Sequence, residues 1–457
     1  MVLVKEKTNP WLYEKLKKVN PPELGLVIEV EHDYTEQVAS ELEALNIKVK
    51  RELISWGRYI PIVALPENIP EIQRIPHVRA VHYEMPRYPY QMVDPLLGEI
   101  RISRVEVPLN LPEAVITSLP ILPFGGPLGI FLPFVRPGVE AWPTGRTREI
   151  IGAPRENTVT TRVAVLDTGS PLPSHPLRRF RHIEEISTTG EAPLDGLGHG
   201  VWCHTCAFLG EAPTGLGDVK SVADAMNSIH VKCLSNLGFG STTSVLKAME
   251  AAYKWGAKVV SMSLGGPLQG GVDEDPECRI VQETGDEVFW VVAAGNSGPN
   301  EWTIGSPAAA PKALTVGAYS PKYEDVSIYS SRGPSAQWYK ENPDAWTKDY
   351  AKYGENLIKP DVLAPGGGPV EKDQEPVDLI YSGGQGWTDG VYDSPFDAFT
   401  LMRGTSMACP HASGLAVLLY ERKGYKTTGE IKSVMGEAWG KVKDIARGYG
   451  LMYWDKF

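Results

Sequence analysis

Between residues 162 and 420 the chain alternates short apolar runs with amphipathic stretches, and this alternation restricts the folds open to it. The first run, Arg162–Leu166, is followed at once by Asp167-Thr168-Gly169. Further runs of strand length lie at 229–234, 259–264, 288–294 and 313–318, and helical patterns lie at 243–255 and 412–420. Strands that are apolar on both faces and separated by helices predict an α/β fold, a doubly wound and mostly parallel sheet.

The N-terminal part of the chain has a different order of elements. Strand patterns at 24–30, 47–53, 59–64 and 78–83 are interleaved with helical patterns at 34–45 and 69–75, after a charged helix at 11–18. The order βαββαβ is typical of an α+β, ferredoxin-like module. Because 457 residues exceed one ordinary core, we divide the chain into this module (1–85), a linker (86–148) and the α/β domain (149–457).

The linker is rich in proline and aliphatic residues, with strands predicted only near 99–107. Its apolar stretch, Leu119–Val135, approaches the length of a membrane span, but repeated prolines and glycines interrupt it. We therefore predict no transmembrane helix, and the role of segment 108–137 stays open. Residues 1–7 show no signal peptide, so the location is left open between an intracellular protein and one exported after a removed signal.

Charge and cysteine content exclude some functions. A net charge of −11 argues against nucleic acid as a partner, because phosphate binding needs a basic face. The cysteine number, five, is odd and favours buried free thiols. Cys203 and Cys206 have the spacing of a metal or redox pair, but no second pair accompanies them. We assign no metal ligands.

Two polar residues stand where a parallel sheet collects functional groups, at strand ends. Asp167 ends the most apolar strand of the chain, although aspartate is also a common turn residue. His199 lies between Gly198 and Gly200, which let other backbone approach the imidazole, although a surface loop is the alternative. The other candidate histidines lack such a setting: His175, His204 and His411.

Two further candidates follow along the chain. Asn296 comes directly after a buried strand, where its amide suits an oxyanion or simply a turn. Ser406 lies in the segment 404–414, between a Gly-Thr turn and an apolar helix. A hydroxyl there sits beside unpaired N–H groups and the positive end of the helix dipole, which suits a nucleophile, although a helix N-cap is the alternative.

With these residues in the order Asp167, His199, Asn296 and Ser406, the chain resembles the subtilisin-type serine proteases, or subtilases. Other segments resemble signatures of that family and extend the resemblance from Ile151 to about Gly450: 151–154, 330–334, 359–366 and the whole of 404–414. The resemblance implies a serine endopeptidase acting on polypeptides. It assigns Ser406 as nucleophile, His199 as general base and acid, Asp167 as orienting carboxylate and Asn296 as oxyanion donor.

The resemblance also implies how a peptide is bound. Two segments would pair with an extended substrate as neighbouring strands, and Pro307 would help to wall the primary pocket; the strand residues are Gly238, Phe239, Gly240, Ser263, Leu264, Gly265 and Gly266. The N-terminal module resembles an inhibitory pro-domain that binds in cis, with self-processing somewhere between Pro86 and Glu149. No cofactor is required for the chemistry. Structural calcium, with the acidic loop 273–275 as candidate, is left open against a solvated charge run.

The sequence departs from the family pattern after the histidine. Segment 201–205 is Val-Trp-Cys-His-Thr, where the family usually has Thr-His-Val-Ala-Gly. Cys203 and Cys409 therefore lie near the reactive groups, and we expect sensitivity to thiol reagents. The alternative function is a subtilase that cleaves only itself and serves as a scaffold or binding protein. An esterase is disfavoured, because 404–408 lacks the Gly-x-Ser-x-Gly elbow.

Overall fold

The computed structural model describes residues 23–89, 139–178, 183–214, 217–385, 398–439 and 442–457. The predicted helix at 11–18, the strands near 99–107 and the apolar stretch 119–135 lie outside these residues. Among the described residues, no helix has both the length and the apolar character needed to cross a membrane.

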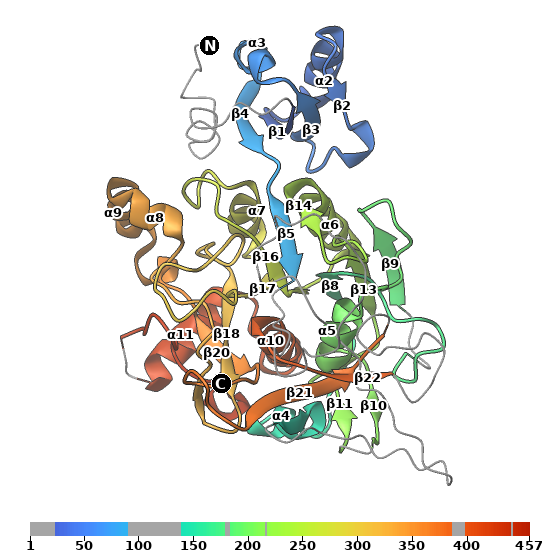
Figure 1. The fold of residues 1–457 in the computed structure, drawn as a ribbon, viewed down its shortest axis with the longest axis vertical. Coiled ribbons are helices and arrows are strands. Elements are labelled where there is room, and N and C mark those ends of the chain that lie inside the picture. The colour runs from blue at the N-terminus through green and yellow to red at the C-terminus, as the bar shows by residue number, and fades with distance from the viewer. Residues whose placement is uncertain (1–22, 90–138, 179–182, 215–216, 386–397, 440–441) are drawn as a thin grey trace.

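The centre of the molecule is an eight-stranded sheet in the order β19-β18-β17-β15-β8-β13-β9, with β20 also paired to β18 (Figure 1). All pairs are parallel except β18 with β19. The strands are β8 (Val163–Asp167), β9 (Ile183–Ser187), β13 (Ser228–Lys232), β15 (Val259–Met262), β17 (Phe289–Ala293), β18 (Leu314–Ser320), β19 (Asp325–Val326) and β20 (Val362–Pro365). The predicted α/β fold with a mostly parallel sheet is confirmed.

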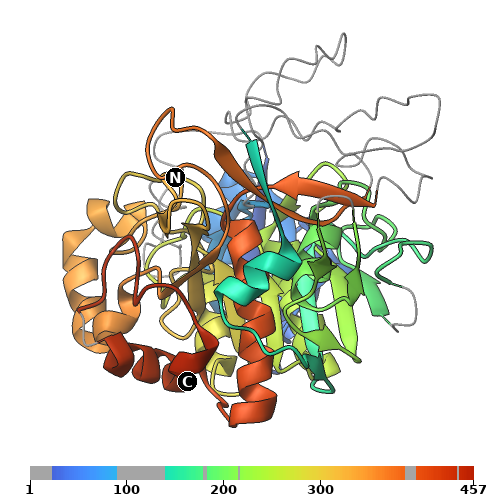
Figure 2. The same cartoon turned by 90° about the horizontal axis from the view of Figure 1, so that it is seen from below.

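Helices cover both faces of this sheet because successive strand residues point in opposite directions. Val163 and Val165 of β8 pack in one apolar cluster with α5 (His199–Ala207) and α10 (Thr405–Leu418). Ala164 and Leu166 pack in the other with α6 (Thr242–Trp255) and α7 (Pro276–Thr284). Figure 2 shows α10 crossing the middle of the molecule.

Smaller elements surround the main sheet. A second sheet has the order β22-β21-β6, and two separate strand pairs are β10 with β11 and β12 with β7. Their bounds, with the remaining helices, are β6 (Val139–Pro143), α4 (Thr144–Ile150), β7 (Thr158–Val159), β10 (Glu211–Ala212), β11 (Val219–Lys220), β12 (Asp224–Ala225), α8 (Gln337–Glu341), α9 (Pro343–Tyr353), β21 (Val377–Gly383), β22 (Phe399–Met402) and α11 (Thr428–Trp439). Residues 139–148, which the sequence assigned to the linker, are thus part of folded elements, because β6 pairs along the apolar strand β21.

The N-terminal module is a four-stranded antiparallel sheet in the order β2-β3-β1-β4. Its elements are β1 (Leu24–Val30), α2 (Thr35–Ala44), β2 (Lys48–Val49), β3 (Tyr59–Ala64), α3 (Ile69–Ile72) and β4 (Val78–Tyr83). The strand predicted at 47–53 was wrong in length: β2 ends at Val49, and Arg51–Leu53 forms a 3₁₀ turn. In that turn Arg51 pairs with Glu36 and Glu43 at the surface.

The module rests on α6 and α7 (Figure 1). Trp56 donates from Nε1 to the Leu246 carbonyl at 2.9 Å, and Glu84 accepts from the Thr243 N–H at 2.8 Å at the start of α6. Arg279 of α7 forms an ion pair with the buried Glu29. Apolar, hydrogen-bonded and charged contacts together therefore hold the module on the two helices.

After β4 the chain leaves the module as a further strand, β5 (Pro86–Pro89). This strand lies between β14 (Gly240–Ser241) and β16 (Leu264–Gly265), antiparallel to both. The sequence had assigned these residues to an extended linker, so the start of that linker was predicted incorrectly. Local pattern did not reveal the strand, because its partners come from a distant part of the chain.

Candidate active site

Asp167 and His199 meet at the carboxyl edge of the sheet. Asp167 is the last residue of β8, and His199 is the first of α5. The distance between Asp167 Oδ1 and His199 Nδ1 is 2.6 Å, and both side chains are fully buried. The Thr168 hydroxyl accepts the Gly200 N–H at 2.8 Å, which ties the strand end to the start of the helix.

The loop before α5 contains a residue that the sequence reasoning missed. Asp195 is buried, and its carboxylate accepts N–H groups from Gly198 at 2.8 Å and Val201 at 2.9 Å. A carboxylate at a helix N-terminus satisfies unpaired N–H groups, so Asp195 positions His199 through the helix. The available signal was an acidic residue just before a predicted helix.

Gly200 is required here, because a Cβ atom would lie 2.6 Å from the Gly169 carbonyl oxygen.

Ser406 is the second residue of α10 and is also buried. Its Oγ donates to the Ser263 carbonyl at 2.9 Å, and the Ser263 hydroxyl donates to the Ser406 carbonyl at 3.0 Å. Cys203 touches both reactive residues: its Sγ lies 4.0 Å from His199 Nε2 and 3.6 Å from the Ser406 carbonyl oxygen. The structure therefore brings Asp167, His199 and Ser406 into one buried cluster.

Asn296 lies beside the same helix start. Its Oδ1 accepts from the backbone N–H and from the hydroxyl of Thr405, each at 2.9 Å. Because the Thr405 N–H can only donate, the amide oxygen must face Thr405, and the amide NH₂ occupies the opposite edge of the side chain. Thr405 precedes Ser406 directly, so the amide group is fixed next to the serine.

The segments predicted to bind peptide are paired with β5. Gly240 pairs with Arg87, Gly265 with Tyr88, and Leu264 with Pro89. The remaining predicted residues lie at or beside this strand. The Phe239 ring is 5.8 Å from that of Tyr88, and a Cβ atom at Gly238 would be 3.5 Å from Pro89, whereas one at Gly266 would be 2.6 Å from the Pro86 carbonyl oxygen. Ser263 precedes Leu264 in the sequence, and Pro307 follows Ser306, which forms a β-bridge with Gly266. An extended strand of the chain itself thus fills the predicted peptide site.

The cysteines are not placed to react. All five are free and buried, and burial raises the pKa of Cys203 and raises that of Cys409 to about 11. Since the thiolate is the reactive form, this burial argues against sensitivity to thiol reagents, which stays a prediction. Cys203 faces His199, whereas Cys206 Sγ lies 3.4 Å from His411 Nδ1. The two thiols do not converge on one metal position.

The acidic loop does not form a calcium site among the described residues. Asp273 pairs with Lys352 at 2.7 Å, and Glu274 accepts the Gly271 N–H at 3.1 Å. Asp275 caps α7 by accepting the Glu277 N–H at 3.1 Å. Calcium needs several oxygen ligands around one point, and these carboxylates are directed to different partners. We therefore assign no calcium ligands.

The competing histidines are held neutral inside the protein. Burial lowers the pKa of His204 to about 3, and those of His175 and His411 to about 4. His411 bonds the Met407 carbonyl at 2.8 Å and lies 2.6 Å from the Thr147 hydroxyl. These contacts give His411 the packing role that the sequence suggested.

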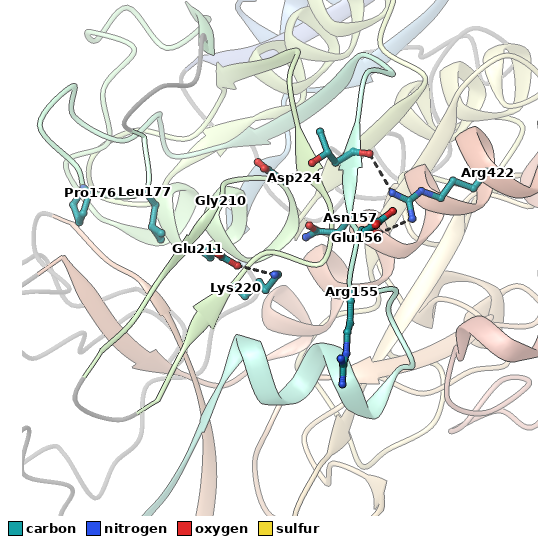
Figure 3. Close-up of a pocket in the computed structure, with 11 residues that line it drawn as sticks. Arg155, Glu156, Asn157, Pro176, Leu177, Gly210, Glu211, Lys220, Asp224 and Arg422 are labelled. Carbon is teal, nitrogen blue, oxygen red and sulfur yellow. Dashed lines mark hydrogen bonds and ion pairs between the residues drawn. The ribbon is translucent and has the colours of Figure 1, made fainter.

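A separate cavity of about 730 Å³ lies between the start of the α/β domain and the β10–β11 pair (Figure 3). None of the predicted site residues lines it; the lining residues are Arg155, Glu156, Asn157, Thr158, Pro176, Leu177, Gly210, Glu211, Lys220, Asp224 and Arg422. Three of its charged groups bind one another or the backbone: Lys220 pairs with Glu211 at 2.6 Å, and Arg422 donates to the Thr158 carbonyl at 3.3 Å. We assign it no role.

Known proteins resemble this chain in sequence. The sequence matches the subtilase family (peptidase S8) over residues 159–451, which is more than half of the chain and includes all four candidate residues. The chain belongs to the subtilase family. Its relatives include the serine protease AprX of Bacillus subtilis, with 31% identity over 62% of each chain. Pyrolysin of Pyrococcus furiosus is 32% identical over 51% of this subtilase and 17% of its own length.

The fold has a counterpart among solved structures. Fervidolysin of Fervidobacterium pennivorans, described as a keratinolytic enzyme related to subtilisin, superimposes with a TM-score of 0.62 at 18% identity. The match covers 95% of this subtilase and 60% of fervidolysin. At this identity the likeness establishes the subtilisin-like fold alone. This subtilase spans less than two thirds of AprX, pyrolysin and fervidolysin.

Proposed function

We propose that this subtilase is a serine endopeptidase made as a zymogen, whose own N-terminal strand occupies the peptide site until it is cleaved. The observation that carries the proposal is the buried Asp167–His199 pair, which shares contacts to Cys203 with Ser406, at the end of the strand site that β5 fills. A serine, a histidine and a carboxylate in this relation are what acyl transfer to a serine requires.

In the first step Ser406 Oγ attacks the carbonyl carbon of the scissile peptide bond. The hydroxyl gives up its bond to the Ser263 carbonyl and passes its proton to His199 Nε2. Asp167 accepts the hydrogen bond of His199 Nδ1, which leaves Nε2 as the base and stabilises the imidazolium. His199 then protonates the departing amine, the C–N bond breaks, and the acyl group remains on Ser406.

In the second step water replaces the amine. His199 takes a proton from the water, the hydroxide adds to the acyl carbon, and the proton returns to Ser406 Oγ as the ester bond breaks. The products are a peptide acid and a free enzyme. Every proton is carried by residues of the chain, so the mechanism needs no cofactor.

Asn296 would stabilise the negative oxygen formed in both steps. With its Oδ1 held by Thr405, its amide NH₂ is on the edge that can donate to the oxyanion, together with the Ser406 N–H. Asn296→Ala is expected to lower kcat about 10²–10³-fold, the loss measured for the corresponding residue of subtilisin, a member of this family. Steady-state kinetics on a short peptide test this, and an unchanged kcat would remove Asn296 from the mechanism.

The direction of β5 supports self-processing. Pro89 pairs with Leu264, and the preceding residue Ser263 is the one bonded to Ser406, so the carboxyl end of β5 is directed at the nucleophile. We therefore expect the cleaved bond within a few residues after Pro89, near the start of the interval 86–149. The N-terminal module, docked on α6 and α7, would act as an inhibitor-like pro-domain bound in cis.

The test compares wild-type protein with Ser406→Ala, each expressed from Met1. Mass spectrometry should find a new N-terminus shortly after Pro89 in the wild type and none in the variant, and only the wild type should digest casein. Equal processing of both proteins would show that another protease makes the cut. Absence of casein digestion by the processed wild type would contradict the endopeptidase proposal.

A second candidate is a subtilase that cleaves only itself. The buried contacts of β5, above all Arg87 with Glu277, favour this reading, because they would retain the cleaved strand in the site. Its signature would be correct processing without casein digestion, with the N-terminal fragment remaining bound during gel filtration. The same experiment therefore separates the two candidates.

A further inference from the structure

Arg87 is the one charged residue of β5, and it is buried. Its side chain and that of Glu277 are both 0% exposed, and Arg87 Nε lies 2.8 Å from Glu277 Oε1. The two residues are 190 positions apart in sequence. Arg87 belongs to the strand in the peptide site, whereas Glu277 belongs to the wall of that site at the start of α7. The ion pair therefore joins the strand that occupies the peptide site to the wall of that site.

The pocket around the guanidinium is constructed from fixed polar groups. The Ser306 hydroxyl donates to Asp275 Oδ1 at 2.7 Å and lies 3.3 Å from Glu277 Oε2. All three side chains are fully buried. Gly266 leaves the space on the other side, since a Cβ atom there would lie 2.8 Å from Arg87 Nη1. Shape and charge both fit an arginine at this point.

A neutral side chain would leave this pocket unsatisfied. An ionised carboxylate without a partner is costly to bury, and removal of one member of a buried pair is strongly unfavourable. Arginine suits the site because its planar guanidinium is always charged and less strongly hydrated than an ammonium group. A peptide with an uncharged residue here would force Glu277 either to stay unpaired or to take up a proton.

We propose that Glu277, supported by Asp275 and Ser306, forms a subsite that selects arginine in peptide substrates at the position that Arg87 occupies between β14 and β16. The inference deepens the proposed function and rests on it. Substrates would bind where β5 lies, and they would have an arginine at the position of Arg87. The substrate class is extended polypeptides with arginine at this position.

The test uses two fluorogenic peptides with the sequence of residues 84–95, one with arginine at position 87 and one with citrulline, which has the same shape without the charge. Wild-type protein that has completed its processing should cleave the arginine peptide with a kcat/KM on the order of 100-fold higher. Product masses must show the same cleaved bond in both peptides. Equal kcat/KM values would overturn the subsite, whereas failure to cleave either peptide would count against the proposed function itself.

Variants of the pocket separate recognition from folding. Glu277→Gln should bring the arginine-to-citrulline ratio close to one while the citrulline peptide is still cleaved, and Glu277→Asp should retain part of the preference. Asp286→Asn is the matched control, because Asp286 is 69% exposed and pairs only at the surface with Lys312. A Glu277→Gln protein that keeps the wild-type ratio would exclude Glu277 as the selecting group. If that variant does not fold, the wild-type ratio decides the question alone.

The ratio should also depend on pH. Burial raises the pKa of Glu277 to about 7, with Arg87 opposing the shift and Asp275 adding to it. The nearby thiols of Cys233 and Cys278 have pKa values raised by burial and stay neutral. With arginine in the pocket, Glu277 is therefore charged above about pH 7 and neutral below it, so the preference for arginine should fall as the pH drops through 7. Taking the ratio of two peptides cancels any pH dependence that is common to the cleavage of both, and a ratio that rises on acidification would contradict the assignment.

Discussion

Replacing Ser406 by alanine is expected to lower kcat on short peptides about 10⁶-fold, the size of the loss found when the serine of subtilisin is removed. The variant retains Asn296 and the backbone N–H groups at the start of α10, but it has no oxygen to form the acyl intermediate. Residual hydrolysis would come from direct attack by water within the same oxyanion environment. Almost the whole effect should therefore appear in kcat rather than in KM.

The measurement needs matched samples. Since β5 would still fill the cleft of an unprocessed variant, wild type and variant are first brought to the same N-terminus with an unrelated protease. Ser413→Ala is the control: Ser413 is buried in the same helix, and its hydroxyl donates to the Cys409 carbonyl at 2.9 Å and lies 4.0 Å from the Cys409 thiol. That variant should keep nearly wild-type turnover. A Ser406→Ala protein within tenfold of wild type would exclude Ser406 as the nucleophile.

Replacing Asp361 by asparagine is expected to lower the free energy of unfolding by about 3–5 kcal/mol. Asp361 is buried among three buried lysines, with Nζ distances of 2.8 Å to Lys359, 3.3 Å to Lys432 and 2.5 Å to Lys443. Burial opposes ionisation of Asp361, but the lysines outweigh it and hold its pKa below the ordinary value. Without the carboxylate the buried ammonium groups lose their counter-charge. Asparagine also has only one acceptor oxygen, so it cannot accept both on the Oδ2 side, from Thr315 and Lys359, and on the Oδ1 side, from Lys443.

Denaturant unfolding of the Ser406→Ala background, which prevents self-digestion, measures this effect. The control is Asp325→Asn: Asp325 is 40% exposed and pairs with Arg447, which is 50% exposed. Such surface pairs contribute about 0–1 kcal/mol. A loss for Asp361→Asn no larger than that of the control would show that the lysines release their protons at little cost. Burial already lowers the pKa of Lys359 to about 7, so Lys359 is the lysine that we expect to lose its proton in that case.

The sequence was informative wherever the signal is local. Asp167 at a strand end and Ser406 at a helix start were recognisable because apolar runs, glycines and turn residues mark such ends within a few positions. The parallel sheet followed from strands that are apolar on both faces. By contrast, β2 was predicted too long, because an alternating pattern continues into the turn where Arg51 pairs with residues of α2.

The part that the sequence did not predict depends on contacts between distant residues. Residues 86–89 have the composition of a linker, and only their pairing with Gly240 and Leu264 makes them a strand in the peptide site. Cys203 was expected to be reactive from its place in the chain, yet the packing around α5 buries it and raises its pKa.

The sequence by itself therefore determined the family, the sheet and the residues proposed for the chemistry. Strand ends and helix starts can be recognised because a few neighbouring residues specify each of them. The tertiary structure alone decided what occupies the site. The Arg87–Glu277 pair joins residues 190 positions apart, and the local sequence around either residue does not predict the other as its partner. A charge buried by folding acquires its partner only when both segments are in place, so this contact had to be seen in the fold.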